Sequence, residues 1–455
     1  MKPRRRGSDD RLSPPENGAT TGRAMVVGPY LRSRTAKVAA HAEAGGRAPA
    51  ARLEEAVGLA RAIDLEVVEA GLAPLNEIRP ATYLGKGKVD ELAGIAKSHE
   101  IGIVVMDCAL SPVQQRNLEK AFGAKVLDRT GLILEIFGRR ARTREGTLQV
   151  EHAHLTYQKG RLVRSWTHLE RQRGGFGFLG GPGETQIESD RRMIDERIAK
   201  IERELEGVKR TRKLHRDSRK RVPYPIVALV GYTNAGKSTL FNRLTRSDVV
   251  AADMLFATLD PTLRAITLPH GAKAILSDTV GFISDLPTML VAAFRATLEE
   301  VVEADVILHV RDATHEDTAA QAHDVEEVLR ALDIEPNDHD RLIEVWNKID
   351  RLDAEARTQL ANVAERRADR PVLASALTGE GLDALLDMIE TRLARRRVVL
   401  DLVLDPADGA GVSWLHRHAE VMTKGMRDDG RLAMTVRADA TNAERIRGKF
   451  ERASS

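Results

Sequence analysis

The chain has 455 residues and a formal net charge of +3, with 70 Lys and Arg against 67 Asp and Glu. This length exceeds what a single hydrophobic core supports, so we expect several folded units. The single cysteine, Cys108, excludes a disulfide framework and fits a reducing compartment. No stretch approaches the ~20 apolar residues that span a bilayer, and the basic start has no apolar run behind it. We therefore expect a cytoplasmic protein without a membrane span; loose association with a membrane stays open.

Residues 1–24 are rich in Arg, Ser, Pro and Gly and almost lack apolar side chains, so we expect a disordered tail. Residues 25–140 alternate between helical and strand patterns, which predicts a small α/β domain. Helical spacing covers residues 51–62, 90–99 and 112–122, and strand-like runs cover residues 64–69, 101–106 and 125–127.

The segment Gly85-Lys86-Gly87-Lys88 in this domain resembles a phosphate-binding turn but lacks the spacing of a Walker loop. We interpret it as a lysine-flanked turn that opens the next helix, and a second nucleotide site stays the alternative. Cys108 ends an apolar run, so we expect a buried small residue and not a nucleophile.

Two apolar stripes over residues 141–222 predict an antiparallel helical hairpin. The first stripe consists of Leu148, Leu155, Leu162 and Leu169, and the second of Ile194, Ile198, Ile201, Leu205 and Val208. The glycine-rich residues 174–183 lie between the stripes and are expected to form the tip.

The tip combines aromatic, glycine and arginine residues, which suits stacking on RNA bases and contact with phosphates. A plain flexible linker is the alternative. The candidate RNA contacts are Arg173, Phe176, Phe178, Arg191 and Arg192. A basic run near residues 209–221 is usually a solvated helix face, but here it makes an RNA backbone a reasonable partner.

The most informative motif follows Pro223 and Pro225 and the apolar residues 226–230. It consists of Gly231, Tyr232, Thr233, Asn234, Ala235, Gly236, Lys237, Ser238 and Thr239. Its glycines let consecutive N–H groups point at phosphate oxygens, Lys237 neutralises the β/γ charge, and the Ser238 hydroxyl is placed for Mg²⁺. The pattern predicts a nucleoside triphosphate site in a domain over residues 223–397.

Later segments supply the other parts of a guanine nucleotide switch, in order. Asp278-Thr279-Val280-Gly281 offers a carboxylate near Mg²⁺ and a glycine N–H for the γ-phosphate. In Asn347-Lys348-Ile349-Asp350, the Asp350 carboxylate can accept from the ring N–H and the exocyclic amine of guanine, a pairing that adenine does not offer. The Lys348 stem can cover the purine face. The backbone of Ser375-Ala376-Leu377 is expected at the guanine edge.

Position 282 bears on the rate of hydrolysis. Small regulatory GTPases place a glutamine after Asp-x-x-Gly to orient the attacking water, whereas this chain has Phe282. A phenyl ring cannot hydrogen-bond that water, so we expect slow intrinsic hydrolysis and stimulation by a partner. Alternatively, Phe282 packs on the neighbouring segment and another residue positions the water.

After residue 397 the pattern predicts a small α/β domain over residues 398–455. Strand-like runs cover residues 398–404 and 432–437, and helices are expected around 413–422 and from 442. His416 and His418 have no companion ligands in the sequence and are interpreted as helix-surface residues.

Together these residues resemble the HflX family of GTPases, from about residue 26 to residue 397. The resemblance is carried by residues 83–88, by 174–186, by Asn234, by Phe256-Ala257-Thr258-Leu259-Asp260, by 278–282 and by 347–350. It implies a doubly wound P-loop GTPase domain with a mostly parallel sheet. It also implies Mg²⁺ held by Ser238 and Thr258, with Asp278 acting through water, and placement of the tip in the large ribosomal subunit. Asparagine at position 234 accompanies a K⁺ requirement in related GTPases.

The expected function is therefore that of a monomeric GTPase that binds GTP and GDP, contacts the large ribosomal subunit and its RNA, and splits or rescues ribosomes. Three alternatives stay open. They are a regulatory switch whose hairpin docks a protein, a ribosome-assembly factor, and an ATP-driven RNA remodeller that uses the N-terminal domain. Binding to RNA should weaken steeply with salt, whereas a protein groove should be less sensitive.

Overall fold

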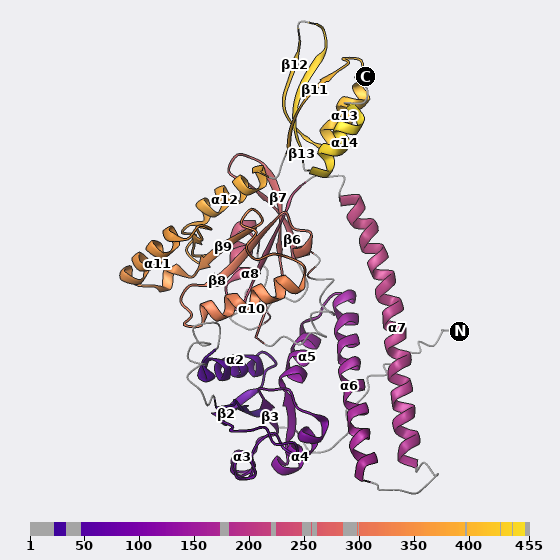
Figure 1. Ribbon diagram of the computed structural model, residues 1–455, viewed down its shortest axis with the longest axis vertical. Coiled ribbons are helices and arrows are strands. Elements are labelled where there is room, and N and C mark those ends of the chain that lie inside the picture. The colour runs from indigo at the N-terminus through magenta and orange to yellow at the C-terminus, as the bar shows by residue number, and fades with distance from the viewer. Residues whose placement is uncertain are drawn as a thin grey trace, which may run out of the picture.

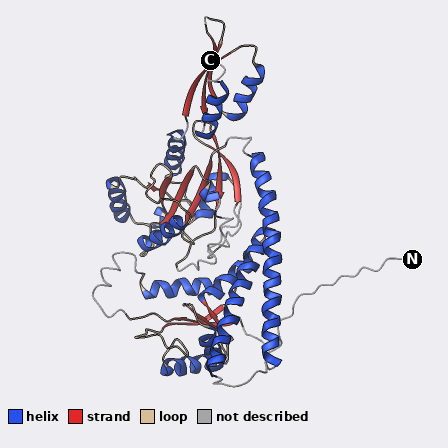
Figure 2. Ribbon diagram, turned by 45° about the vertical axis from the view of Figure 1, so that its right-hand side comes forward, coloured by secondary structure: helices blue, strands red, loops and turns tan. Residues whose placement is uncertain are grey.

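The computed structural model describes residues 22–32, 47–172, 182–219, 224–247, 256, 262–284, 298, 300–395, 398–427, 429–438 and 440–450. An N-terminal domain (22–140), a helical hairpin, a central domain (224–395) and a C-terminal domain (398–450) follow one another along the chain (Figure 1). The central domain lies between the two others, and the second hairpin helix runs alongside (Figures 1 and 2).

The N-terminal domain is a parallel sheet in the order β2-β1-β3-β4. Its strands are β1 (Arg23–Gly28), β2 (Glu66–Leu72), β3 (Ile103–Met106) and β4 (Lys125–Asp128), and its helices are α2 (Pro49–Arg61), α3 (Lys86–Ser98), α4 (Pro112–Phe122) and α5 (Arg129–Arg140). The predicted alternation is therefore observed. Neither the inner strand β1 nor α5 was predicted, and Arg23 and Ala24 belong to β1, so the expected disordered tail extended too far. Residues 1–21 lie outside the described part.

Local sequence explains where two of these helices begin. Ser111 and Gln114 form a capping box at α4, in which Ser111 Oγ accepts from Gln114 N at 3.2 Å and Gln114 Oε1 accepts from Ser111 N at 2.9 Å. α3 begins at Lys86 directly after the extended residue Gly85. The segment therefore opens a helix, as predicted, and a second nucleotide site stays the alternative.

The hairpin consists of α6 (Arg144–Gln172) and α7 (Pro182–Arg219), which lie side by side (Figures 1 and 2). Ile201 is fully buried between them, and Arg197 donates to Glu151 at 2.6 and 2.9 Å. A groove of about 590 Å³ between the helices is lined by Leu155, Leu162, Met193 and Ile194, among others. Arg191 and Arg192 are exposed on α7, whereas Arg173, Phe176 and Phe178 lie outside the described residues.

The central domain is a doubly wound six-stranded sheet in the order β10-β9-β8-β5-β7-β6, parallel except for the edge strand β6. The strands are β5 (Ile226–Gly231), β6 (Thr262–Thr267), β7 (Lys273–Asp278), β8 (Val306–Asp312), β9 (Leu342–Asn347) and β10 (Val372–Leu373). The helices are α8 (Lys237–Thr245), α10 (Thr318–Ala331), α11 (Ala354–Arg366) and α12 (Leu382–Arg395), with a short 3₁₀ turn, η2 (Ile349–Arg351). This is the predicted fold.

Both faces of this sheet are covered, which explains why its inner strands are continuously apolar. On one face Val227 and Leu308 pack with Phe241 of α8 and Leu385 of α12. The opposite face packs on α10 and on the N-terminal domain. Parallel sheets of this type bind ligands at the carboxyl ends of their strands. The phosphate loop after β5, Asp278 of β7 and Asn347 of β9 all lie at that edge.

The C-terminal domain is an antiparallel sheet in the order β11-β13-β12 with two helices. Its elements are β11 (Val398–Leu404), α13 (Gly409–His418), β12 (Glu420–Met426), β13 (Leu432–Ala438) and α14 (Ala440–Phe450). The helix expected over 413–422 was wrong at its end, because Ala419 is extended (φ −149°, ψ 158°) and the chain continues into β12. His416 is exposed on α13, and His418 stacks on Trp414 with ring centroids 4.0 Å apart.

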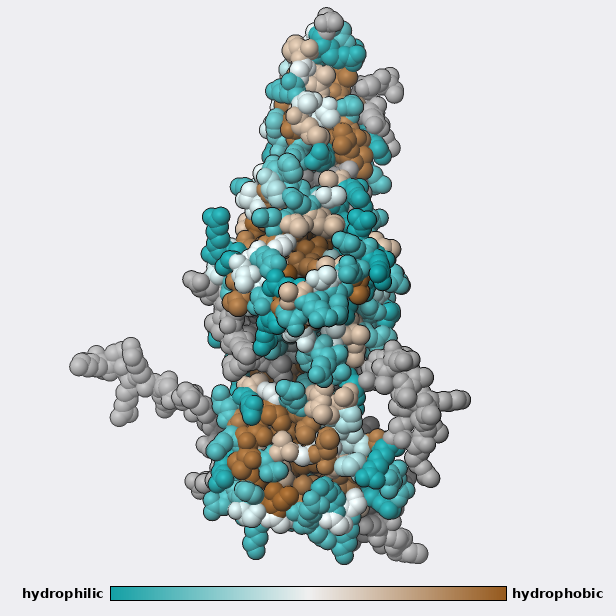
Figure 3. All heavy atoms as spheres, turned by 90° about the vertical axis from the view of Figure 1, so that its left-hand side faces the viewer, coloured by the Kyte–Doolittle hydropathy of each residue, from teal (hydrophilic) through white to brown (hydrophobic). Residues whose placement is uncertain are grey.

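Apolar residues gather on one face of the N-terminal domain, in the lower part of Figure 3. In that domain Leu31, Leu72 and Ile78 are among the large apolar side chains left exposed. Within the described part of the chain, no helix combines the length and the apolar content needed to cross a membrane.

Candidate nucleotide site

The loop after β5 has several residues with positive φ angles, which glycine and asparagine adopt more readily than other residues. Gly231 has φ +150° and Gly236 has φ +92°, and a Cβ at these positions would lie 2.1 Å from Val310 O and 2.2 Å from Asn347 Nδ2. Asn234 is exposed in the left-handed region (φ +60°), which asparagine tolerates better than most side chains. The loop therefore delivers its N–H groups to the start of α8, where a helix N-terminus favours anions.

Lys237, the first residue of α8, is almost fully buried under the loop. Its ammonium donates to Gly231 O at 3.0 Å and to Tyr232 O at 2.7 Å. Burial lowers the pKa of Lys237 to about 8, and the nearby Asp278 carboxylate opposes this shift. A phosphate placed on the loop would favour the charged form and oppose this shift.

Ser238 and Asp278 bring a hydroxyl and a carboxylate together beside the phosphate loop. Ser238 Oγ donates to Asp278 Oδ2 at 2.8 Å, and Asp278 is fully buried at the end of β7. A hydroxyl and a carboxylate suit Mg²⁺, which prefers oxygen ligands and is commonly completed by phosphate and water. Thr258, the expected second hydroxyl, lies outside the described residues, as do Ala257, Leu259 and Asp260. Among the described residues, no group of three or more His, Cys, Asp and Glu could hold a metal.

The Asp-x-x-Gly segment is joined to the phosphate loop by backbone hydrogen bonds. Thr233 N donates to Phe282 O at 2.8 Å, and Phe282 N donates to Gly231 O at 3.1 Å. Thr279 Oγ1 donates to Leu229 O at 2.5 Å. A Cβ at Gly281 would lie 2.9 Å from Thr233 Cγ2 and 3.0 Å from Lys237 Nζ. Gly281 thus lies beside the Thr233 side chain and the Lys237 ammonium.

The expected base-reading residues come together at the ends of β9 and β10. The Asn347 amide donates to Ala235 O at 2.8 Å and accepts from Ala376 N at 2.9 Å. Asp350 Oδ1 accepts from Ser375 Oγ at 2.6 Å. Asn347 therefore ties the base-reading segments to the phosphate loop, while Asp350 is held in place by Ser375.

Lys348 is oriented by Asp312, a residue that the sequence had not singled out. The Lys348 ammonium lies 2.8 Å from Asp312 Oδ2. Burial acts to raise the pKa of Asp312, but hydrogen bonds from Lys348 and Thr314 outweigh it and lower the pKa. Leu377, by contrast, is 70% exposed, so of the Ser375–Leu377 segment only the first two residues are buried beside Asn347 and Asp350.

Comparison with known proteins identifies the family of this chain. The chain matches four consecutive family models, described as GTP-binding GTPase N-terminal (residues 50–138), GTP-binding GTPase Middle Region (140–219), 50S ribosome-binding GTPase (226–348) and HflX C-terminal domain (359–454). It is 50% identical over 402 residues to GTPase HflX of Magnetococcus marinus, covering 88% of this chain and 91% of that protein. The chain belongs to the HflX family of GTPases.

Another HflX relative, from Escherichia coli, is 43% identical over 394 residues, which is 87% of this chain and 91% of that protein. A crystal structure of a GTP-binding protein from Sulfolobus solfataricus in complex with GDP is 24% identical, with a TM-score of 0.42, and covers 82% of this chain and 99% of that one. As a member of the HflX family, this protein binds guanine nucleotide and hydrolyses GTP at the site of its central domain.

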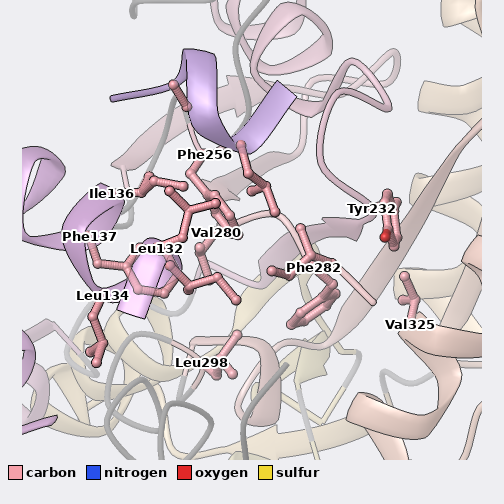
Figure 4. Packing of buried hydrophobic residues seen from close by; sticks show 14 of the residues in the cluster. Leu132, Leu134, Ile136, Phe137, Tyr232, Phe256, Val280, Phe282, Leu298 and Val325 are labelled. Atoms are coloured by element: carbon pink, nitrogen blue, oxygen red, sulfur yellow. The ribbon is translucent and has the colours of Figure 1, made fainter. Parts of the chain in front are cut away.

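In this HflX chain the nucleotide site also packs against the N-terminal domain, which the sequence had not indicated. Phe282 is 1% exposed and Phe256 2% exposed. Both belong to one buried cluster with Leu132 and Phe137 of α5 (Figure 4). Phe137 and Phe256 meet edge to face, with ring centroids 4.7 Å apart. Phe282 is thus packed against neighbouring segments, as the alternative interpretation of position 282 predicts.

A network of buried charged side chains lies beside this hydrophobic cluster. Glu55 of α2 pairs with Arg129 of α5 and with Arg47, at 2.5 Å for the latter pair, and it accepts from the Tyr232 hydroxyl. Arg129 also donates to Asp107 at 2.5 Å. One sequence signal could have indicated two of these charged residues. Asp107 and Arg129 directly follow the apolar strands β3 and β4, and parallel sheets place functional side chains at such strand ends.

Proposed function

We propose that this GTPase binds the large ribosomal subunit through its hairpin and couples GTP binding to splitting or rescuing ribosomes. The observation that carries the proposal is the match of residues 226–348 to the family described as 50S ribosome-binding GTPase. The hairpin supports it, because α7 exposes Arg191 and Arg192 near the predicted glycine-rich tip. Exposed arginines on a projecting helix suit contact with RNA phosphates.

The proposal assigns the nucleotide contacts to the residues predicted from sequence. Lys237 and Gly281 contact the γ-phosphate, Ser238 and Thr258 ligate Mg²⁺, Asp278 acts through water, and Asp350 selects guanine. Support comes from the clustering of the described members at one edge of the sheet. Mg²⁺ would neutralise charge on the phosphates when bound. Intrinsic hydrolysis is slow, since the buried Phe282 supplies no group that orients water, and the ribosome stimulates it.

Sedimentation of the full chain with separated subunits and with intact ribosomes tests this function. With a non-hydrolysable GTP analogue we expect co-migration with large subunits and a shift of intact ribosomes toward separated subunits. With GDP we expect the protein to stay at the top of the gradient. Equal co-migration in both nucleotides would contradict the coupling, and absence of binding in either would contradict the ribosomal partner. Retained binding at high salt would favour a protein-docking hairpin instead.

A further inference from the structure

A buried hydroxyl of the phosphate loop, that of Thr233, is left without a partner. Thr233 is 6% exposed, and its Oγ1 has no hydrogen-bond partner within the part of the chain that the structure describes. An unpaired buried hydroxyl is costly, so such a group usually meets a ligand or an ordered water. Two other hydroxyls beside the loop, those of Ser238 and Thr279, donate to Asp278 Oδ2 and to Leu229 O. Of these three hydroxyls, that of Thr233 remains for a ligand.

The Thr233 side chain faces Gly281, the glycine expected at the γ-phosphate. A Cβ built on Gly281 would lie 2.9 Å from Thr233 Cγ2 and 3.0 Å from Lys237 Nζ. The methyl and hydroxyl groups of Thr233 share one Cβ, so a rotation of χ1 by about 120° between staggered positions exchanges them. The hydroxyl can therefore reach the space beside Gly281 without movement of the backbone.

The backbone around Thr233 is fixed by its neighbours. Thr233 N donates to Phe282 O at 2.8 Å, and the Tyr232 carbonyl before it accepts from Lys237 Nζ at 2.7 Å. The N–H of Thr233 is thus occupied by the Asp-x-x-Gly segment, and the hydroxyl is the donor that this residue can offer to a ligand. A rigid backbone positions such a group with little loss of entropy on binding.

GTP hydrolysis requires a group that orients the attacking water. The water oxygen bonds to the γ-phosphorus while the bond from phosphorus to the bridging oxygen breaks, and the electron pair of that bond stays on GDP. One proton of the water passes to an oxygen of the released phosphate. A glutamine amide both accepts and donates hydrogen bonds, whereas the phenyl ring of Phe282 does neither. A hydroxyl has one donor and two lone pairs, so it offers both functions of the amide.

We propose that Thr233 is a catalytic residue of GTP hydrolysis, whose hydroxyl accepts a hydrogen bond from the attacking water and donates one to a γ-phosphoryl oxygen. The proposal rests on the proposed placement of the γ-phosphate beside Lys237 and Gly281. It names a residue that positions the water where Phe282 does not. The hydroxyl stays neutral throughout the step, so it supports the slow basal turnover and leaves room for stimulation by a partner.

A purely structural role of Thr233 predicts a different result. Valine has nearly the shape of threonine, and replacing an unpaired buried hydroxyl by a methyl group is neutral or stabilising for a fold. Thr233→Val should therefore fold with an unchanged or higher Tm. If the hydroxyl only fills space, this variant should also hydrolyse GTP at the rate of the unmodified protein.

The test compares three variants of the full chain in the absence of ribosomes. Thr233→Val removes the hydroxyl, and Thr233→Ser keeps the hydroxyl but removes the methyl group. The control Thr245→Val makes the same exchange about 12 Å along α8 from Lys237, where the Thr245 hydroxyl donates to Phe241 O at 2.7 Å. Single-turnover hydrolysis is measured with Mg²⁺. Calorimetry gives the dissociation constants of GDP, of a non-hydrolysable GTP analogue, and of GDP with aluminium fluoride, which mimics the phosphoryl group during transfer.

We expect the hydrolysis rate to fall about 10- to 100-fold in Thr233→Val, the usual effect of removing one hydrogen bond to a charged group. The affinities for GDP and for the GTP analogue should change less than about twofold, because the contact with water forms in the reaction and not in binding. Affinity for GDP with aluminium fluoride should fall together with the rate. Thr233→Ser should retain most of the rate, and the control should match the unmodified protein.

An unchanged rate in Thr233→Val overturns the proposal, as does a rate in Thr233→Ser as low as in Thr233→Val. If Thr233→Val does not fold, Thr233→Ala takes its place. Gly281→Ala tests the placement of the γ-phosphate separately, and it should weaken the GTP analogue while sparing GDP. If it does so and Thr233→Val hydrolyses normally, the placement stands and the role of Thr233 falls. If Gly281→Ala affects both nucleotides alike, the placement and the role of Thr233 fall together.

Discussion

Asn347 engages protein groups with both ends of its side-chain amide, at Ala235 and at Ala376. The residue thereby fixes the distance between the phosphate loop and the base-reading segments. It also restricts Gly236, where a Cβ would meet the amide at 2.2 Å. In the proposed assignment the base is recognised by Asp350, whose carboxylate is oriented by Ser375.

Replacing Asp350 by Asn should therefore change base selectivity while sparing the fold. The amide loses one acceptor for guanine and gains a donor that suits xanthine, so GTP affinity should fall by roughly one to two orders of magnitude. Competition between GTP and xanthosine triphosphate in a fluorescent-nucleotide displacement assay measures the change. Undiminished selectivity for GTP would show that Asp350 is not the base reader.

We expect Lys237 to make nucleotide binding depend on pH. Its pKa is lowered to about 8 by burial, from an ordinary value of 10.5. Phosphate oxygens favour the ammonium, so binding raises this pKa and takes up protons at any pH where the unliganded group is partly neutral. Calorimetry of GDP binding in buffers of different ionisation enthalpy should show little uptake near pH 7 and clear uptake near pH 9. Lys237→Arg, which stays charged throughout, should lose the pH dependence of uptake.

Asn234 can be examined with monovalent salts. Its left-handed backbone and exposure explain why asparagine is tolerated there, and an asparagine amide oxygen has lone pairs that can ligate a cation. If K⁺ assists hydrolysis at this position, turnover in K⁺ buffer should exceed turnover in Na⁺ buffer, and Asn234→Gly should abolish the difference without weakening GDP binding. Equal turnover in the two salts excludes this role.

At the scale of elements, motif spacing and apolar runs predicted the phosphate loop and the Asp278 and Asn347 motifs, whereas the doubly wound sheet was expected from the family resemblance, and β6 and β8 were not predicted as strands. Each of these motifs follows a strand that is buried on both faces and therefore continuously apolar. β1 was missed because Arg23 and Ala24 merge with a polar tail in the sequence. The contacts of Glu55 and Arg129 with Ser284 could not be predicted, because they join segments 155 or more residues apart and depend on how two domains pack.

The role of the hairpin tip can be tested by deletion. Deleting residues 174–183 removes the predicted tip, while α6 and α7 remain joined by contacts such as Arg197 with Glu151. GDP and GTP affinities should stay unchanged, because the nucleotide site lies in the central domain. Stimulation of hydrolysis by large subunits should be lost. Steady-state phosphate release with and without subunits measures both effects, and full stimulation of the deletion variant would assign ribosome contact to another surface.

For the whole molecule, the shared core means that the central domain is incomplete on its own. A fragment of residues 224–395 would expose Tyr232, Phe256 and Phe282, which are at most 4% exposed in the full chain. Exposed aromatic clusters lower stability and promote association. We expect the fragment to have a lower Tm than the central domain within the full chain and to bind a hydrophobic dye. A stable, monomeric fragment that binds no dye would show that the cluster rearranges after truncation.

The short connection between α5 and α6 has a mechanical consequence. α5 ends at Arg140 and α6 begins at Arg144, so the first hairpin helix starts almost directly from the helix that carries Arg129. The 29 residues of α6 extend for about 43 Å at 1.5 Å per residue. A rotation of about 5° at the base of such a rod would carry its far end through roughly 4 Å. Because Tyr157 and Arg161 of α6 are bonded to Asp128, the helix would turn together with the N-terminal domain, and its length would convert a small rotation of that domain into a displacement larger than a water molecule.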